Sequence, residues 1–126
     1  MKGLEFLFLG GGAVLGAFLR YKVTESQIVF NTIPLNVMIV NVIGAFILGM
    51  FVIFSEQWNF DSKYSLFAAV GFCGSLTTMS SFALDSSNLI DTHRYIALGI
   101  NLVANVGLSI GALIGGKVIA NMVTGG

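Results

Sequence analysis

The chain has 126 residues, of which 56% are hydrophobic and only 10% are charged. Soluble domains carry about 25% charged residues to cover their surface, so this composition excludes a soluble protein and indicates an integral membrane protein. Six basic and six acidic residues cancel, which excludes nucleic acid as a partner. A chain this short cannot comfortably enclose a pore alone, so we expect it to oligomerise in the lipid bilayer.

Four apolar segments are long enough to cross a bilayer, which takes about 20 helical residues. The expected helices lie in one domain over residues 1–126 and span residues 4–22, 34–54, 63–90 and 95–122. Gly12 and Gly16 lie one turn apart in the first segment and predict close packing against another helix. Residues 23–33 are read as a polar loop. Pro34, the only proline, is placed at the start of the second helix, where its missing N–H is harmless.

The third segment is interrupted by small and hydroxylated residues, which predict a helix break near residues 74–78. Non-helical backbone at membrane depth is tolerated only where it is buried in protein or lines a wet cavity. One interpretation is a helix kinked by Ser and Thr, or small residues that pack against a neighbour. The other is a break that exposes carbonyls and hydroxyls to an ion.

Asparagines are the notable polar residues within the apolar segments. Asn41 is either a clamp between helices or a ligand group, because an unbonded amide in the membrane is unfavourable. The fourth segment carries two series at four-residue spacing on different faces, which are Asn101, Asn105 and Ser109, and Gly107, Gly111 and Gly115. We expect the glycine face to pack tightly and the polar face to form either interhelical hydrogen bonds or a polar track.

The polar residues favour transport of a small anion over catalysis. The chain lacks a nucleophile–base pair and a cluster of metal ligands, which excludes an enzyme. Neutral amide and hydroxyl donors replace the water shell of a small, strongly hydrated anion without trapping it. Ring edges such as that of Phe82 add partial positive charge. Arg20 either snorkels to the interface or concentrates anions at a mouth, and Asp85 lies within the membrane or at a vestibule.

The basic residues divide equally between the two ends of a four-helix bundle. The end that holds the termini carries Lys2, Lys63 and Lys117, and the opposite end carries Arg20, Lys22 and Arg94. This equal division gives no positive-inside bias, so it does not set which end of the bundle faces the cytoplasm. It predicts that copies insert in both orientations and pair antiparallel, as fused inverted repeats do in larger transporters.

Three motifs in this order make the chain resemble the Fluc/CrcB fluoride channels over nearly its whole length. They are residues 11–21 (GGAVLGAFLRY), 41–49 (NVIGAFILG) and 71–82 (GFCGSLTTMSSF). The last looks like the family's glycine-rich Thr-Phe-Ser-Thr-Phe signature. The resemblance implies an antiparallel, dual-topology homodimer with two fluoride pores. It also implies a structural sodium ion at the two-fold axis, held by the backbone carbonyls of Gly74 and Thr77 from both chains and not transported.

The same resemblance assigns a fluoride pathway. Asn41 matches a hydrogen-bond donor of the family, and Met79 and Phe82 match two phenylalanines, so that one ring is missing here. The hydroxyl track of the family matches Ser80, Ser81 and Ser109. Asp85 stands where the family commonly has Glu, and Arg20 matches an arginine near the end of the first helix.

The sequence thus predicts an all-α protein with four transmembrane helices and a broken third helix. The expected function is passive export of fluoride across the cytoplasmic (inner) membrane, with sodium as the one cofactor and with lipid and a second copy of the chain as partners. One rival, a small multidrug transporter, requires a membrane-embedded Glu in its first helix, and this chain has only Glu5 near the end of that helix. The other rival is a membrane scaffold that transports nothing.

Overall fold

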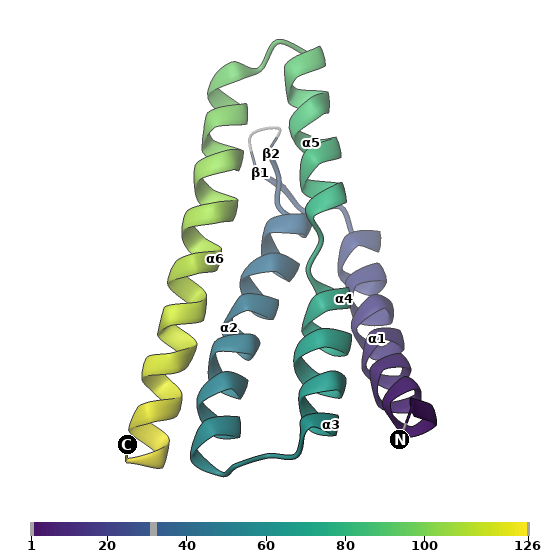
Figure 1. Cartoon of the computed structure of the whole chain (residues 1–126). Coiled ribbons are helices and arrows are strands. Elements are labelled where there is room, and N and C mark those ends of the chain that lie inside the picture. The colour runs from purple at the N-terminus through teal and green to yellow at the C-terminus, as the bar shows by residue number, and fades with distance from the viewer. Residues whose placement is uncertain (1, 31–32, 126) are drawn as a thin grey trace.

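The computed structural model describes residues 2–30 and 33–125, and residues 1, 31, 32 and 126 of the expected domain lie outside that part. Within it, four helical spans are long and apolar enough to cross a membrane, which confirms the predicted multi-pass membrane protein. The spans are α1 (Lys2–Glu25), α2 (Asn36–Gln57), a third span over Ser62–Asp91, and α6 (Tyr95–Thr124) (Figure 1). The third span consists of α3 (Ser62–Ser65), the π-helix η1 (Leu66–Cys73), α4 (Gly74–Leu76) and α5 (Met79–Asp91).

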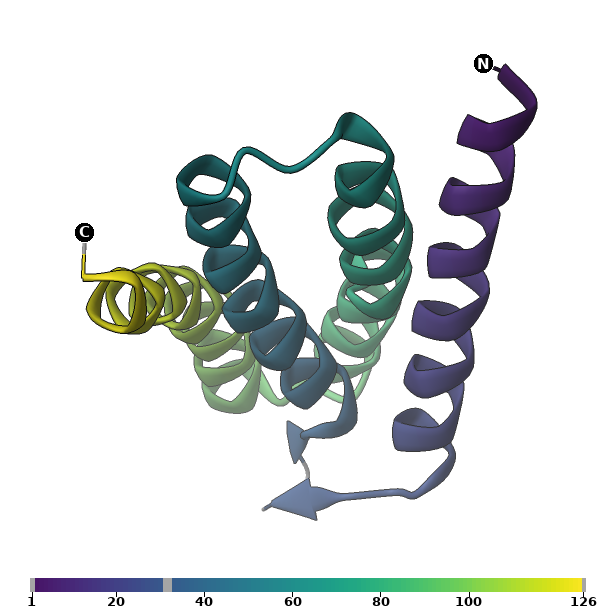
Figure 2. The ribbon, with the colours of Figure 1, turned by 90° about the horizontal axis from the view of Figure 1, so that it is seen from below.

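The spans form a curved row in which α1 and α6 occupy the two edges (Figure 2). Helix α2 and the third span lie between them, and both termini are at the same end of the molecule (Figure 1). The third span and α6 extend well beyond the ends of α1 and α2 at the opposite end. We call this projecting pair of helices, residues 79–104, the α5–α6 arm.

Glycines set the close contact between α1 and the third span. A methyl group added at Gly12 would overlap the carbonyl of Phe67, and one added at Gly16 would overlap the carbonyl of Phe72. Gly71 faces the backbone of α1 in return. The predicted packing role of Gly12 and Gly16 is therefore confirmed.

On α6, a different glycine packs against α2 from the ones expected. Gly116 meets the backbone at Phe46, and Gly49 of α2 meets the backbone at Leu113. Gly107, Gly111 and Gly115 have no atom of the described chain within 4 Å of an added methyl group. The expected tight packing of that glycine face does not occur within the chain, because the neighbouring helix lies on another side of α6.

The connection between α1 and α2 also differs from the expected loop. Helix α1 continues to Glu25, and β1 (Val29–Phe30) pairs antiparallel with β2 (Ile33–Pro34). Pro34 pairs with Val29 instead of starting a helix, and α2 begins two residues later at Asn36.

The side chain of Asn36 holds this hairpin in place. Its Oδ1 accepts from the amide of Ile28 at 2.9 Å, and its Nδ2 donates to the carbonyls of Val23, at 2.7 Å, and Ser26. Asn36 is itself buried. A tertiary contact therefore fixes the connection, which local sequence pattern does not reveal.

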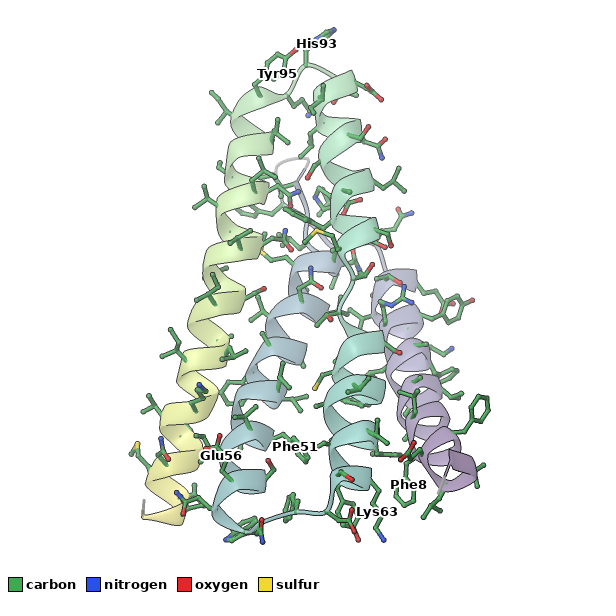
Figure 3. The ribbon with its side chains drawn as sticks, in the orientation of Figure 1. Phe8, Phe51, Glu56, Lys63, His93 and Tyr95 are labelled. Carbon is green, nitrogen blue, oxygen red and sulfur yellow. The ribbon has the colours of Figure 1, made fainter. Side chains whose placement is uncertain are left out.

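An aromatic cluster lies at the end that holds the termini, where Figure 3 labels Phe8, Phe51 and Lys63. The Nζ of Lys63 lies 5.8 Å from the ring centroid of Phe8 and 5.3 Å from that of Tyr64, so it links α1 to the third span. At the opposite end, His93 lies in the turn between α5 and α6, and Tyr95 is the first residue of α6.

Candidate functional site: the break in the third span

The third span is broken at Thr77 and Thr78, inside the predicted stretch 74–78. Both residues have extended backbone, with ψ of 155° at Thr77 and φ and ψ of −151° and 123° at Thr78. The hydroxyl of Thr78 accepts from the amide of Ser81 at 3.2 Å and thereby caps α5. The break thus separates α4 from α5, and the facing ends of both helices carry backbone groups that have no partner within their own helix.

Two amides near the break donate to side chains instead of to the carbonyls they would meet in a continuous helix. In an α-helix the amide of Thr78 would donate to the carbonyl of Gly74, and the amide of Ser81 to that of Thr77. Here the Thr78 amide donates to Oδ1 of Asn41 at 2.8 Å, and the Ser81 amide donates to the Thr78 hydroxyl. The carbonyls of Gly74 and Thr77 are therefore released from the helical pattern.

These two freed carbonyls are the positions assigned above to sodium. Carbonyl oxygens of unwound backbone are the ligands that membrane proteins use for Na⁺. Gly74 is exposed and also lines the cavity described below. Two carbonyl oxygens released from the helical pattern are a donor set that fits a small hard cation.

Arg20 also contacts the break. Its Nε donates to the carbonyl of Ser75 at 2.9 Å, across 55 residues of sequence. A cation at the carboxyl end of a helix is favourable, and this contact satisfies a carbonyl that the break would leave without a partner. The hydroxyl of Thr77 donates to the carbonyl of Cys73 at 3.0 Å, and that carbonyl also accepts from the Thr77 amide at 3.1 Å.

A chain of amide side chains runs from the break into the protein. Nδ2 of Asn41 donates to Oδ1 of Asn105 at 3.2 Å, and Nδ2 of Asn105 donates to Oδ1 of Asn101 at 2.9 Å. Asn101, only 1% exposed, donates in turn to the hydroxyl of Ser86 at 3.2 Å. This network joins α2, α6 and α5, so all three asparagines act as clamps in the structure.

A cavity of about 450 Å³ opens beside the break, between α2, the third span and α6. It brings together six of the residues assigned from the sequence, which are Asn41, Gly74, Thr77, Met79, Phe82 and Ser109. Asn105 also lines it, and Asn101 does not. The buried Oγ of Ser109 has no hydrogen-bond partner among the described residues.

The other four assigned residues do not line this cavity. The hydroxyls of Ser80 and Ser81 lie 3.1 and 3.3 Å from that of Thr78, in the first turn of α5. Asp85 lies one turn further along α5 and is half-buried, and Arg20 lies on the α1 side of the break. Thr78 and Asn105, by contrast, belong to the cavity but were not assigned to it from the sequence.

The sequence that forms this break, cavity and hydrogen-bond network is similar to the sequences of known proteins. A family model described as CrcB-like protein, Camphor Resistance (CrcB), matches residues 7–117. Over 117 residues the chain is 71% identical to the Fluoride-specific ion channel FluC of Nitrosopumilus maritimus (strain SCM1), and the match covers 93% of each chain. It is 36% identical over 117 residues to the protein of the same name from Methanococcus vannielii, with 93% of this chain and 96% of that one covered.

A further relative comes from Sulfurihydrogenibium sp. (strain YO3AOP1), again named Fluoride-specific ion channel FluC. It is 37% identical over 121 residues, and the match covers 94% of this chain and 98% of the relative. The chain therefore belongs to the CrcB family, a family of ion channels and not of enzymes, as the sequence predicted.

Proposed function

We propose that the protein is a fluoride-selective passive channel of the cytoplasmic (inner) membrane that lets F⁻ leave the cell. Its membership of the CrcB family and the names of its relatives support fluoride as the transported ion. The negative-inside membrane potential favours the exit of an anion by about 2.3 kcal/mol per 100 mV. Export therefore requires neither ATP nor a proton relay.

The observation that carries this proposal is the pair of neutral donors at the cavity. The buried Ser109 hydroxyl has no hydrogen-bond partner in the part of the chain that the structure describes, and Nδ2 of Asn41 makes two long contacts, at 3.2 and 3.4 Å. A donor that its own protein holds weakly is available to an anion. Phe82 and Met79 also line the cavity, and Ser80, Ser81 and Asp85 would extend the polar path along α5 towards its outer end.

The channel works as an antiparallel homodimer of two chains inserted in opposite orientations. The α5–α6 arm supports this, because it projects beyond α1 and α2 and exposes large apolar side chains, among them Leu84, Ile96 and Val103. A second copy or lipid must cover that surface. The equal division of basic residues between the two ends supports insertion in both orientations.

A sodium ion at the two-fold axis is held by the carbonyls of Gly74 and Thr77 from each chain. The two freed carbonyls described above support this donor set. When bound, the ion supplies a positive charge that both broken helices share, and so it stabilises the interface. Arg20 and Asn41 keep the neighbouring backbone groups of the break bonded to protein.

Fluoride efflux from liposomes tests the proposal directly. Liposomes that contain the purified protein in sodium buffer should release fluoride rapidly to an electrode, and parallel liposomes loaded with chloride should not release chloride. Release at the rate of empty liposomes from folded, dimeric protein contradicts the channel and favours a scaffold. Equal release of both ions contradicts the selectivity.

A further inference from the structure

We propose that Asn41 also positions the sodium site, and that its two side-chain atoms have separate tasks. Its oxygen keeps the Thr78 amide away from the carbonyl of Gly74, and its nitrogen faces the anion cavity. One side chain would then couple the cation site to the fluoride pathway. This inference rests on the proposed function, since it concerns the same sodium ion and the same pathway.

The direction of the amide is fixed by its partners. The Thr78 backbone amide can only donate, so the atom that meets it at 2.8 Å must be Oδ1 of Asn41. The nitrogen is therefore left for the other side, where it contacts Oδ1 of Asn105 and the carbonyl of Thr78. Since Asn105 uses its own nitrogen on Asn101, it offers Asn41 only an acceptor.

The bond to Thr78 determines whether the carbonyl of Gly74 is available. A buried amide without a partner is unfavourable by about as much as a lost hydrogen bond. Without the Asn41 oxygen, the simplest repair is to rewind the break, so that the Thr78 amide donates to the Gly74 carbonyl as in an α-helix. That carbonyl would then have to give up a helical bond before it could bind a cation.

Two nearly isosteric variants separate the two tasks. Asn41→Asp keeps an oxygen for the Thr78 amide in either protonation state but removes the nitrogen donor. Asn41→Leu removes both atoms at a similar volume. Asn105→Leu is the matched control, because it removes the partner of the Asn41 nitrogen and leaves the bond to Thr78 intact.

The experiment measures sodium binding separately from transport. Each protein is purified in potassium buffer and titrated with sodium chloride at constant ionic strength, and the apparent affinity is taken from the rise in the thermal unfolding temperature. Fluoride efflux is measured on the same samples. We expect Asn41→Leu to weaken sodium binding at least tenfold, and Asn41→Asp and Asn105→Leu to bind sodium within threefold of the parent or more tightly. Asn41→Asp should nevertheless lose at least tenfold in fluoride efflux.

The possible outcomes distinguish this inference from the proposed function. If Asn41→Leu binds sodium as the parent does, or if Asn41→Asp loses sodium as Asn41→Leu does, the positioning role is overturned while the channel stands. If Asn41→Leu does not fold, retained sodium binding by Asn41→Asp together with lost efflux still supports the separate tasks. A parent protein that conducts fluoride but is not stabilised by sodium overturns both the sodium site and this inference.

Discussion

At the scale of single residues, a substitution at Ser109 should reduce fluoride transport and leave the stability of the protein almost unchanged. Its buried hydroxyl has no partner among the described residues, so Ser109→Ala should change the free energy of unfolding by no more than about 0.5 kcal/mol. Fluoride efflux should nevertheless fall about fivefold, which corresponds to one hydrogen bond of about 1 kcal/mol lost from the pathway. Thermal unfolding and liposome efflux of the same preparation check both parts. Ser55→Ala, at the distant end of α2, is the control, and an unchanged efflux in Ser109→Ala contradicts the assignment.

Arg20 should behave in the opposite way, as a residue of structural importance. Its Nε is the partner of the Ser75 carbonyl, so Arg20→Ala should lower the free energy of unfolding by about 1.5–3 kcal/mol, the range for a hydrogen bond to a charged group. Lys22→Ala is the matched control, because the exposed pair of Lys22 with Glu25 contributes less than about 1 kcal/mol. Equal losses in the two variants, measured by thermal unfolding in detergent, would contradict the capping role.

The residue types of the site could be predicted, but their bonding could not. An asparagine in an apolar segment and hydroxyls at a helix break are visible in the sequence, and Asn41, Phe82 and Ser109 line one cavity in the structure. The direction of each amide depends on whether its neighbour donates or accepts, which only the folded backbone determines. The contact between Arg20 and Ser75 spans 55 residues and leaves no local pattern.

At the scale of elements, the glycines of α1 govern how closely the third span can approach. Gly12→Ala would place a methyl group on the carbonyl of Phe67, and we expect a loss of about 3 kcal/mol from overpacking. Gly10→Ala is the matched control in the same helix, because an added methyl group there meets no atom of the described chain. It should be neutral or stabilising, since Ala favours helix over Gly by up to about 1 kcal/mol. Thermal unfolding of both variants checks the contrast, and a similar loss in both would contradict it.

The elements that followed from local pattern were predicted well, and those that depend on distant contacts were not. The length of the apolar segments predicted the four spans, and the small and hydroxylated residues in the third segment predicted the break. The hairpin depends on Asn36, which reaches back across the connection to Val23 and Ile28. The π-helix η1, in which the amide of Gly74 donates to the carbonyl of Ala69, arises in the span that packs against the glycines of α1. Periodicity places a residue on a helix face but does not say which face meets a neighbour, as Gly107 on α6 illustrates.

At the scale of the whole molecule, the two ends are distinct in structure but balanced in charge. One end carries the termini and the aromatic cluster with Lys63, and the other carries the α5–α6 arm with His93 and Tyr95 (Figure 3). Insertion is directed by the number of basic residues at each end and not by shape. Three basic residues at each end therefore give no positive-inside bias, although the two ends look unlike each other.

Removing basic residues from one end should make one orientation dominant and disrupt the channel. Lys22→Ser with Arg94→Ser leaves three basic residues at the terminal end and one at the other, which favours the terminal end in the cytoplasm. Lys63→Ser with Lys117→Ser gives the reverse bias. We expect a reporter fused to the C-terminus of the parent to be found on both sides of the membrane, and each double variant to place it mainly on one.

The two double variants then test whether antiparallel pairing is needed for transport. Each expressed alone should lose most of its fluoride efflux, because it lacks partners of opposite orientation. Both expressed together should recover it, because each supplies the orientation that the other lacks. Since neither variant touches the cavity or the break, loss followed by recovery is explained by orientation and not by damage to the pathway. Full efflux from either double variant alone, with its reporter on one side, would show that the channel does not need an antiparallel partner.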